Sequence, residues 1–294
     1  MKEVADGIYW LQAPVRGVSN VFSSYLIREP EGVLIEPGPS TAIPTIREAM
    51  KRLDMNDLAY IMPTHIHVDH AGGAGSLAHL FPHAKVLVHP RGAKHVIDPA
   101  NLIRSTREVW GENYEDYFGP VLPVPEAQLR VPEDGDVVHV NGRRIQVIYA
   151  PGHAPHNMAF YEDESRALFC GEALGLPGQG AEPFPLPAVA PPSFDQELYL
   201  ETMDKLRRLK PRILFFSHGG VGSDPDRTIS VAMENTRMLG DMILKALKEG
   251  QPIEAISSML AEEAASRFGV HLSEMDLSMT VGGYKLYFQK KGLA

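Results

Sequence analysis

The stretch Thr64-His65-Ile66-His67-Val68-Asp69-His70 decides how this chain is interpreted. It holds three imidazoles and a carboxylate, and alternation directs His65 and His67 to one side while Asp69 and His70 point elsewhere. Imidazole and carboxylate ligands suit zinc, iron or manganese, and a ligand set without thiolates is typical of a catalytic metal site. The alternative is a polar turn that happens to contain histidines, and four ligand-type residues so close together disfavour it.

The residues around this stretch predict where it lies in the fold. An apolar run of strand type, 59–62, precedes it and ends at Pro63. Small residues follow at 71–75, which allow a tight turn into a helix that starts at 76–78. We therefore expect the ligand-type residues on a loop at the carboxyl end of a strand, where α/β proteins build their sites.

Three further candidate ligands each follow a predicted strand of their own. Residues 144–149 run into His153, residues 167–170 run into Glu172, and residues 213–216 run into His218. A strand followed by a ligand, repeated four times, is hard to explain by core packing. The pattern predicts that seven side chains converge at one edge of a sheet, which is enough for two metal ions.

The motif set as a whole resembles the metallo-β-lactamase superfamily over about residues 6–220. The shared features are HxHxDH, a histidine in a Pro-Gly-His turn, an acidic residue after Leu-Phe-Cys-Gly, and a last histidine before glycine. The resemblance implies an α/β fold, a four-layer αββα sandwich, here with a C-terminal helical extension like that of the glyoxalase II-like group. It implies a first metal ion on His65, His67 and His153, and a second on Asp69, His70 and His218.

Two acidic residues depart from the family pattern. Glu172 stands where the family usually has an aspartate that bridges the two ions, and Glu36 stands where an outer aspartate is usual. Because Glu172 is one methylene longer, either its strand ends further back or its carboxylate binds one ion only. We expect Glu172 to be a ligand.

The expected domain organisation is a catalytic domain at 1–222 and a helical region at 223–294. Strands are expected at 7–11, 22–27, 32–35 and 85–89, with a hairpin turn at Asn141-Gly142, and helices at 41–53 and 194–209, the latter capped by Ser193. The tail is expected to form helices at 228–248, 252–267 and 274–290, which contribute either a pocket wall or a homodimer face. Its methionines are interpreted as core filler.

Two segments interrupt the pattern. A helical insertion at about 91–125 carries four aromatic residues, and a proline-rich loop at 176–192 includes Pro183 and Phe184. They form either an apolar wall beside the substrate or ordinary packing. The aromatic residues of the insertion are Trp110, Tyr114, Tyr117 and Phe118.

His156 also has two interpretations: it lines the pocket, or it is a solvated turn histidine.

Composition limits the classes of function. The formal net charge of −9 argues against a general nucleic-acid binder. The single cysteine, Cys170, excludes an internal disulfide, fits a reducing compartment and is interpreted as a buried structural thiol. There is no signal-type start and no long apolar run, so a cytoplasmic location without a membrane contact is expected.

The expected function is hydrolysis by a dinuclear metal enzyme of a small ester, thioester or lactone. Two divalent ions lower the pKa of a bridging water toward about 7, and Asp69 would both bind metal and orient the resulting hydroxide. Zinc is the first expectation, with iron or manganese as alternatives. An iron redox enzyme of the persulfide dioxygenase type is the second hypothesis. A phosphodiesterase is the third, although the chain lacks an obvious basic stretch for phosphate.

Overall fold

The structure, a computed structural model, describes residues 1–13, 22–177, 185–269 and 271–294. Pro183 and Phe184 of the predicted proline-rich loop lie outside the described residues. The chain divides into two units, each built from several segments. Unit 1 consists of Met1–Tyr149, His156–Gly171 and Pro211–Ser223, and unit 2 of Ala150–Pro155, Glu172–Lys210 and Asp224–Ala294. The predicted boundary at residue 222 concerns independent domains and stays a prediction.

The first sheet of unit 1 is mixed. Its strands are antiparallel from β1 to β4 and parallel from β4 to β7. The strands predicted at 7–11, 22–27 and 32–35 are confirmed as β2, β3 and β4, and β1 is an additional strand. In spatial order the strands are β1 (Lys2–Ala5), β2 (Ile8–Ala13), β3 (Phe22–Ile27), β4 (Gly32–Ile35), β5 (Leu58–Met62), β6 (Lys85–Leu87) and β7 (Leu129–Arg130).

The second sheet of unit 1 is also mixed, because β11 and β12 are parallel and the other pairs antiparallel. The predicted turn joins β8 to β9, with Asn141 and Gly142 both left-handed at φ 47° and 95°. In spatial order the strands are β13 (Val221–Gly222), β12 (Ile213–Phe216), β11 (Ala167–Gly171), β10 (Met158–Glu162), β9 (Arg143–Tyr149) and β8 (Val137–Val140).

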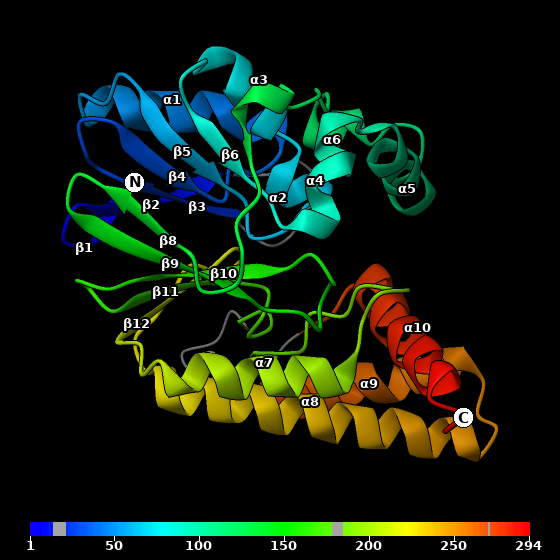
Figure 1. Ribbon diagram of the computed structural model, residues 1–294. Helices are drawn as coiled ribbons and strands as arrows, with labels where there is room; N and C mark the ends of the chain where they lie inside the picture. Colours follow the sequence, from blue (N-terminus) through cyan, green and yellow to red (C-terminus); the bar gives the residue numbers. More distant parts are fainter. Residues whose placement is uncertain (14–21, 178–184, 270) are drawn as a thin grey trace. The chain divides into compact units, whose positions relative to one another are not determined.

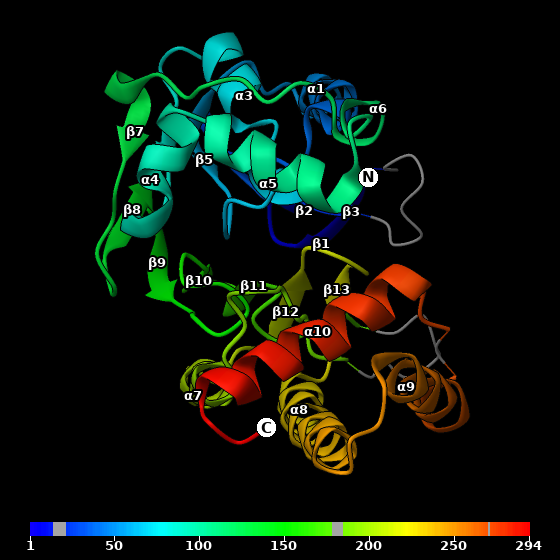
Figure 2. The ribbon, with the colours of Figure 1, turned by 90° about the vertical axis from the view of Figure 1, so that its right-hand side faces the viewer.

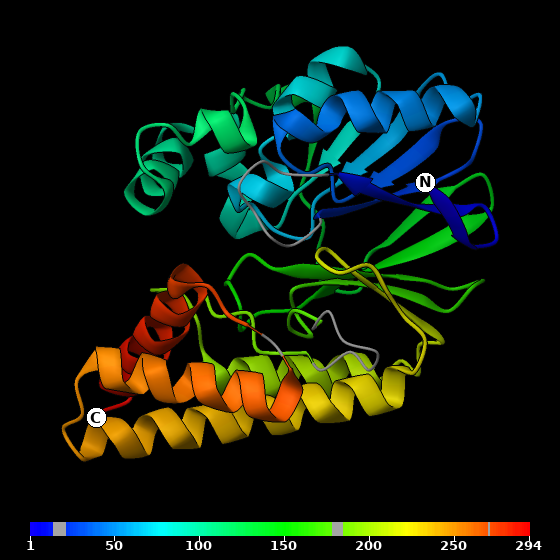
Figure 3. The same cartoon turned by 180° about the vertical axis from the view of Figure 1, so that it is seen from behind.

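The two sheets pack face to face within unit 1. Side chains such as Tyr25 and Ile35 from the first sheet share one buried core with Phe169 and Phe215 from the second. Helices cover the other face of the first sheet, where Ile46 and Leu77 join a second core (Figures 1 and 3). The helical elements of unit 1 are η1 (Ser40–Ala42), α1 (Ile43–Arg52), α2 (Val68–Ala71), α3 (Ala74–Leu80), α4 (Pro90–Ile97), α5 (Ala100–Trp110), α6 (Glu115–Phe118) and η2 (Glu126–Gln128).

Unit 2 is helical. Its helices are α7 (Gln196–Arg208), α8 (Pro225–Lys248), α9 (Ile253–Phe268) and α10 (Glu274–Lys290), and α8 packs against α7 and α10. The predicted cap of α7 was wrong by two residues. Asp195, not Ser193, precedes the helix, and its carboxylate accepts the backbone N–H of Leu198 at 3.1 Å.

The helical insertion of unit 1, α4 to α6, lies beside the first sheet (Figure 2). Tyr114 and Phe118 are buried in the core formed with α1 and α3, and Trp110 and Tyr117 pack against it. Of the two interpretations, this supports ordinary packing for these aromatic residues.

No helix in the described part of the chain is long and apolar enough to cross a membrane. The two sheets of unit 1 and the helices of unit 2 confirm the expected α/β sandwich with C-terminal helices.

Candidate metal centre

The ligand-type stretch of unit 1 begins where β5 ends, as predicted, but only its first half is a loop. Asp69 and His70 belong to the short helix α2, which corrects the expectation that all four residues lie on a loop. The predicted pairing of His65 with His67 is present, since His65 Nε2 lies 2.9 Å from His67 Nδ1. His65 is buried and His67 is half-buried. Two ring nitrogens at this separation need a shared hydrogen or a cation between them.

Glu36 fixes the orientation of His70. The Glu36 carboxylate accepts the Thr64 hydroxyl at 2.6 Å and lies 3.2 Å from His70 Nδ1. With the Nδ1 hydrogen directed to Glu36, the Nε2 atom is the one that faces Asp69, 3.4 Å from its Oδ2. This is the carboxylate–histidine arrangement that orients metal-binding imidazoles. Glu36 therefore acts at the position where the resemblance implied an outer aspartate.

Asp69, His70 and His218 form one donor set. His218 follows β12, and its Nε2 lies 3.4 Å from Asp69 Oδ2. One ligand-type atom from each of the three residues lies within 4.8 Å of the other two. Burial alone would raise the pKa of Asp69 and lower that of His70. Their mutual attraction, together with His218 on one side and Glu36 on the other, outweighs burial and reverses both directions.

The two candidate ligands of unit 2 form a second pair. His153 Nε2 lies 2.9 Å from Glu172 Oε2, and both side chains are buried. His153 Nδ1 lies 2.9 Å from the carbonyl oxygen of Ala188. A carbonyl only accepts, so Nδ1 carries the hydrogen and Nε2 is the nitrogen presented to the carboxylate. Within unit 2, the Glu172 carboxylate is therefore the group that His153 Nε2 faces.

His156 was ranked too low from the sequence. Its ring stacks on His65 with centroids 6.1 Å apart and an interplanar angle of 13°, and meets the His67 ring edge-on at 5.5 Å. The interpretation as a solvated turn histidine does not describe a half-buried ring in this position. Its spacing of three residues from His153 was the only available signal.

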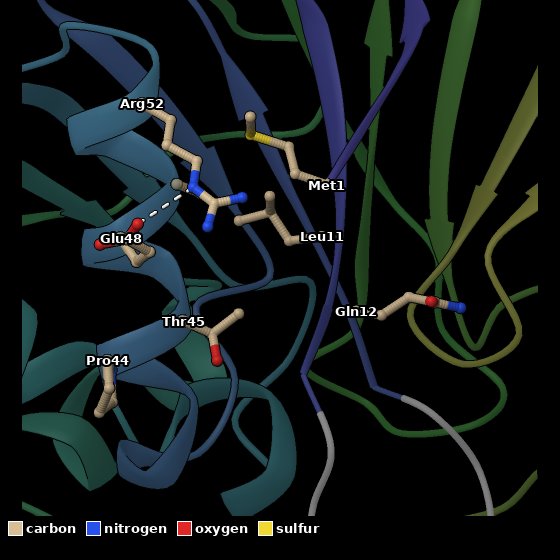
Figure 4. Close-up of a pocket in the computed structure, with 8 residues that line it drawn as sticks. Met1, Leu11, Gln12, Pro44, Thr45, Glu48 and Arg52 are labelled. Atoms are coloured by element: carbon tan, nitrogen blue, oxygen red, sulfur yellow. Dashed lines mark hydrogen bonds and ion pairs between the residues drawn. The ribbon is translucent and has the colours of Figure 1, made fainter.

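Two other features lie apart from the ligand candidates. Cys170 is fully buried with a pKa raised by burial, and its thiol donates to the Phe215 carbonyl, which confirms a structural thiol. A surface hollow of about 370 Å³ lies between α1 and β2, and Figure 4 shows Leu11, Gln12 and the Arg52–Glu48 ion pair around it. The residues that line the hollow include none of the candidate ligands.

The comparison with known proteins identifies the family. The sequence model of the metallo-beta-lactamase superfamily matches residues 17–218, so the chain belongs to this superfamily, whose members are mostly metal-dependent hydrolases. The predicted family and the fold that it implied are thereby confirmed.

Three relatives illustrate the range of similar proteins. The metallo-beta-lactamase fold-containing protein ST1585 of Sulfurisphaera tokodaii is 30% identical over 194 residues, which cover 65% of this chain and 69% of that protein. Its crystal structure matches with a TM-score of 0.68 and 24% identity, covering 95% of this chain and 98% of that chain.

The other two relatives carry names of thioester chemistry. The human acyl-coenzyme A thioesterase MBLAC2 is 26% identical over 192 residues, 59% of this chain and 65% of that protein. The hydroxyacylglutathione hydrolase GloC of Haemophilus influenzae is 25% identical over 170 residues, 53% of this chain and 68% of that protein. The chain thus spans just under two thirds of the length of the human relative.

Proposed function

We propose that this protein is a dinuclear metal-dependent hydrolase that cleaves a small thioester. The observation that carries the proposal is the Asp69–His70–His218 donor set. Two of its members, Asp69 and His70, follow the His65–His67 pair on the same segment, so a second group of donors accompanies the first. His153 and Glu172 are proposed to complete the first site with His65 and His67. Esters and lactones are the other substrates that the same chemistry serves.

The residues fit a divalent ion by their chemistry. All seven donors are imidazoles or carboxylates, which suit zinc first and iron or manganese as alternatives. The lowered pKa of Asp69 keeps it ionised, as a ligand must be. The Nδ1 atoms of His70 and His153 face acceptors, so both imidazoles are oriented by outer groups. Two ions bound there would supply Lewis acidity and acidify a water molecule.

The protein residues have separate tasks in this reaction. Water adds to the carbonyl carbon, the carbon–sulfur bond breaks, and an acid and a thiol leave. Asp69 would accept a hydrogen bond from the attacking water and orient it, because its carboxylate is ionised and faces His218 and His70, and the proton that the water loses ends on the sulfur of the departing thiol. Glu36 keeps the His70 ring in place during this step by holding Nδ1.

Thioesters are favoured over other substrates by the relatives. An acyl-coenzyme A thioesterase and a hydroxyacylglutathione hydrolase both bear names that denote cleavage of an acyl–sulfur bond. The negative net charge of the chain is consistent with a small substrate and not with a nucleic acid.

The test combines metal analysis with a substrate panel. We expect two zinc or manganese ions per chain in protein purified without added metal, and hydrolysis of acyl thioesters in preference to esters and lactones. His65→Ala and His153→Ala should abolish turnover while the protein stays folded, whereas His83→Ala, at an exposed turn, should not. Full activity in either ligand variant would refute the proposal. One iron per chain with oxygen consumption would replace it with the redox alternative.

A further inference from the structure

Two tyrosines, one in each unit, place their hydroxyl groups on the backbone of a ligand-bearing segment. Tyr25 and Tyr199 are both fully buried. Each hydroxyl bonds to main-chain atoms beside a candidate ligand. Burying a phenolic hydroxyl costs free energy unless it is hydrogen-bonded, and a phenylalanine would fill the same space without that cost. The two hydroxyls are therefore expected to stabilise the backbone segments that they contact.

Tyr25 closes the loop that carries His218. The Tyr25 hydroxyl lies 2.7 Å from the Phe216 carbonyl oxygen and 2.9 Å from the Gly220 carbonyl oxygen, so one hydrogen is shared between the two ends of this loop. Within this loop, Gly219 and Gly220 have left-handed φ values of 83° and 90°, which only glycine adopts easily. The aromatic ring of Tyr25 packs against the rings of Phe169 and Phe215, which also contact each other.

Other groups of β2 and β3 support the same loop. The backbone N–H of Ser23 donates to the Ser217 carbonyl at 2.7 Å, and the Phe22 ring meets the His218 ring edge-on at 5.7 Å. A side chain at Gly220 would collide with the Trp10 indole, whose N–H donates to the Ser23 hydroxyl. The Tyr25 hydroxyl is the contact in this group that a single conservative substitution removes.

Tyr199 does the equivalent for His153 and Glu172. Its hydroxyl donates to the Glu172 carbonyl at 2.6 Å and accepts the Ala188 backbone N–H at 3.3 Å. The Ala188 carbonyl in turn accepts His153 Nδ1 at 2.9 Å. One hydroxyl thus links the main chain of one candidate ligand to the group that orients the other.

The turn before His153 rests on the same helix. A Cβ atom on Gly152, whose φ is 129°, would lie 2.3 Å from the Tyr199 Cα atom. The Thr202 hydroxyl donates to the Pro151 carbonyl at 2.6 Å, and the Asp195 backbone N–H donates to the Gly152 carbonyl. Helix α7 therefore holds this turn through several contacts, of which Tyr199 reaches both ligand segments.

We propose that Tyr25 and Tyr199 are positioning residues, one for each metal ion. Tyr25 fixes the loop that carries His218 and so positions a ligand of the ion that Asp69, His70 and His218 would hold. Tyr199 fixes the segments that carry His153 and Glu172 and so positions ligands of the other ion. This inference rests on the dinuclear centre of the proposed function. Neither tyrosine is placed on the substrate or on the reacting atoms. Each fixes the position of a metal ligand, so removal of its hydroxyl should first lower the affinity of the protein for the metal ion.

The experiment measures zinc binding to each site in Tyr25→Phe and Tyr199→Phe. Apo-protein is titrated with Zn²⁺ against a chelating dye, and the visible spectrum of the Co²⁺-loaded protein reports the geometry around the ions. Losing an outer partner of a ligand costs about 10–100-fold in metal affinity. We expect that loss at one site in each variant, with a changed Co²⁺ spectrum, and an affinity within about 3-fold of the original at the other site.

A His218→Ala background identifies which site is affected. This substitution removes a ligand of the second ion, so adding Tyr25→Phe should then change nothing at the remaining site, whereas adding Tyr199→Phe should still weaken it. Tyr284→Phe is the matched control. Tyr284 is equally buried, and its hydroxyl also donates to a backbone carbonyl, that of Thr236 at 2.9 Å. It should lose folding stability without a change in either metal affinity.

Results that overturn the inference are distinct from those that overturn the function. If both variants bind zinc as Tyr284→Phe does, or if both weaken the same ion, or if the unaltered protein binds one ion only, the inference is wrong. Two tightly bound ions without hydrolysis of any thioester would refute the function and leave the pairing of tyrosines with ions intact. Should a variant fail to fold, Gly219→Ala, which strains the left-handed turn that Tyr25 closes, replaces Tyr25→Phe, and Thr202→Val, which removes the hydroxyl bonded to the Pro151 carbonyl, replaces Tyr199→Phe.

Discussion

Arg143 of β9 offers a stability prediction whose size follows from the structure. Its side chain is 9% exposed, and its guanidinium group lies 2.6 Å from Glu29 Oε1 and 3.5 Å from Glu162 Oε1. It also donates to the Asp6 carbonyl at 2.8 Å. Glu162 is fully buried, so replacing Arg143 by alanine leaves a buried carboxylate without its counter-charge.

The magnitude comes from the attraction that is lost. Two unit charges 3.5 Å apart attract by about 5 kcal/mol at an effective dielectric constant of about 20. Two backbone N–H groups, of Glu164 and Ser165, still donate to Glu162 and retain part of its solvation. Breaking a buried pair by removing one partner costs about 3–5 kcal/mol, and these two bonds place Arg143→Ala near the lower value.

The adjacent residue provides the control. Arg144 pairs with Asp163 at 3.0 Å, but both side chains are about half exposed, and exposed pairs contribute about 0–1 kcal/mol. Thermal and urea unfolding should therefore show a melting temperature lower by about 6–12 °C for Arg143→Ala and almost unchanged for Arg144→Ala. Equal effects of the two substitutions would refute the reasoning from burial. So would a full recovery of stability in Arg143→Ala upon raising the salt concentration, because salt screens repulsion that involves the exposed Glu164 but does not offset the lost counter-charge of the buried Glu162.

Two further predictions concern a pH dependence and the outer partner of His70. Burial, and then the charge of Arg91, lower the pKa of His89 to about 4, and its neutral Nδ1 accepts the Arg91 backbone N–H at the start of α4. Because the unfolded histidine titrates near about 6.5, the unfolded state binds more protons below that pH. Stability should therefore fall as the pH drops from about 6.5 toward 4, and His89→Asn, which keeps a capping acceptor, should flatten that part of a melting-temperature profile. Glu36→Gln should lower the affinity for one zinc ion by about 10–100-fold, as measured by chelator competition, because the amide no longer holds the His70 Nδ1 hydrogen with a full charge; an unchanged affinity would show that Glu36 is structural.

Local sequence patterns point to the candidate donors but not to the residues that support them. His65, His67, Asp69 and His70 lie within six positions, and each further candidate donor follows a strand, so local patterns were enough to select them as candidates. The Ser193 cap failed because Ser193 and Asp195 are both good capping residues, and only the course of the backbone decides between them. The helix α2 inside the motif was missed because its four residues are too few to show a helical period.

The supporting residues were out of reach for a different reason. Tyr25 meets the His218 loop across 191 and 195 positions of sequence, through a side chain that bonds to carbonyl groups. A carbonyl is the same in every residue, so no residue type at the receiving end marks the contact. Glu162 likewise reads as an ordinary strand-end glutamate until the fold brings Arg143 to it.

The nitrogen that each histidine presents follows from these supports and not from the motif. Thr64 Oγ1 lies 3.1 Å from His65 Nδ1, Glu36 faces His70 Nδ1, and the Ala188 carbonyl accepts His153 Nδ1, so these three imidazoles present Nε2. His67 is the exception, because its Nδ1 faces His65 Nε2. For His65, His70 and His153 the neighbouring acceptors, and not the HxH spacing, therefore determine which nitrogen is available to a metal ion.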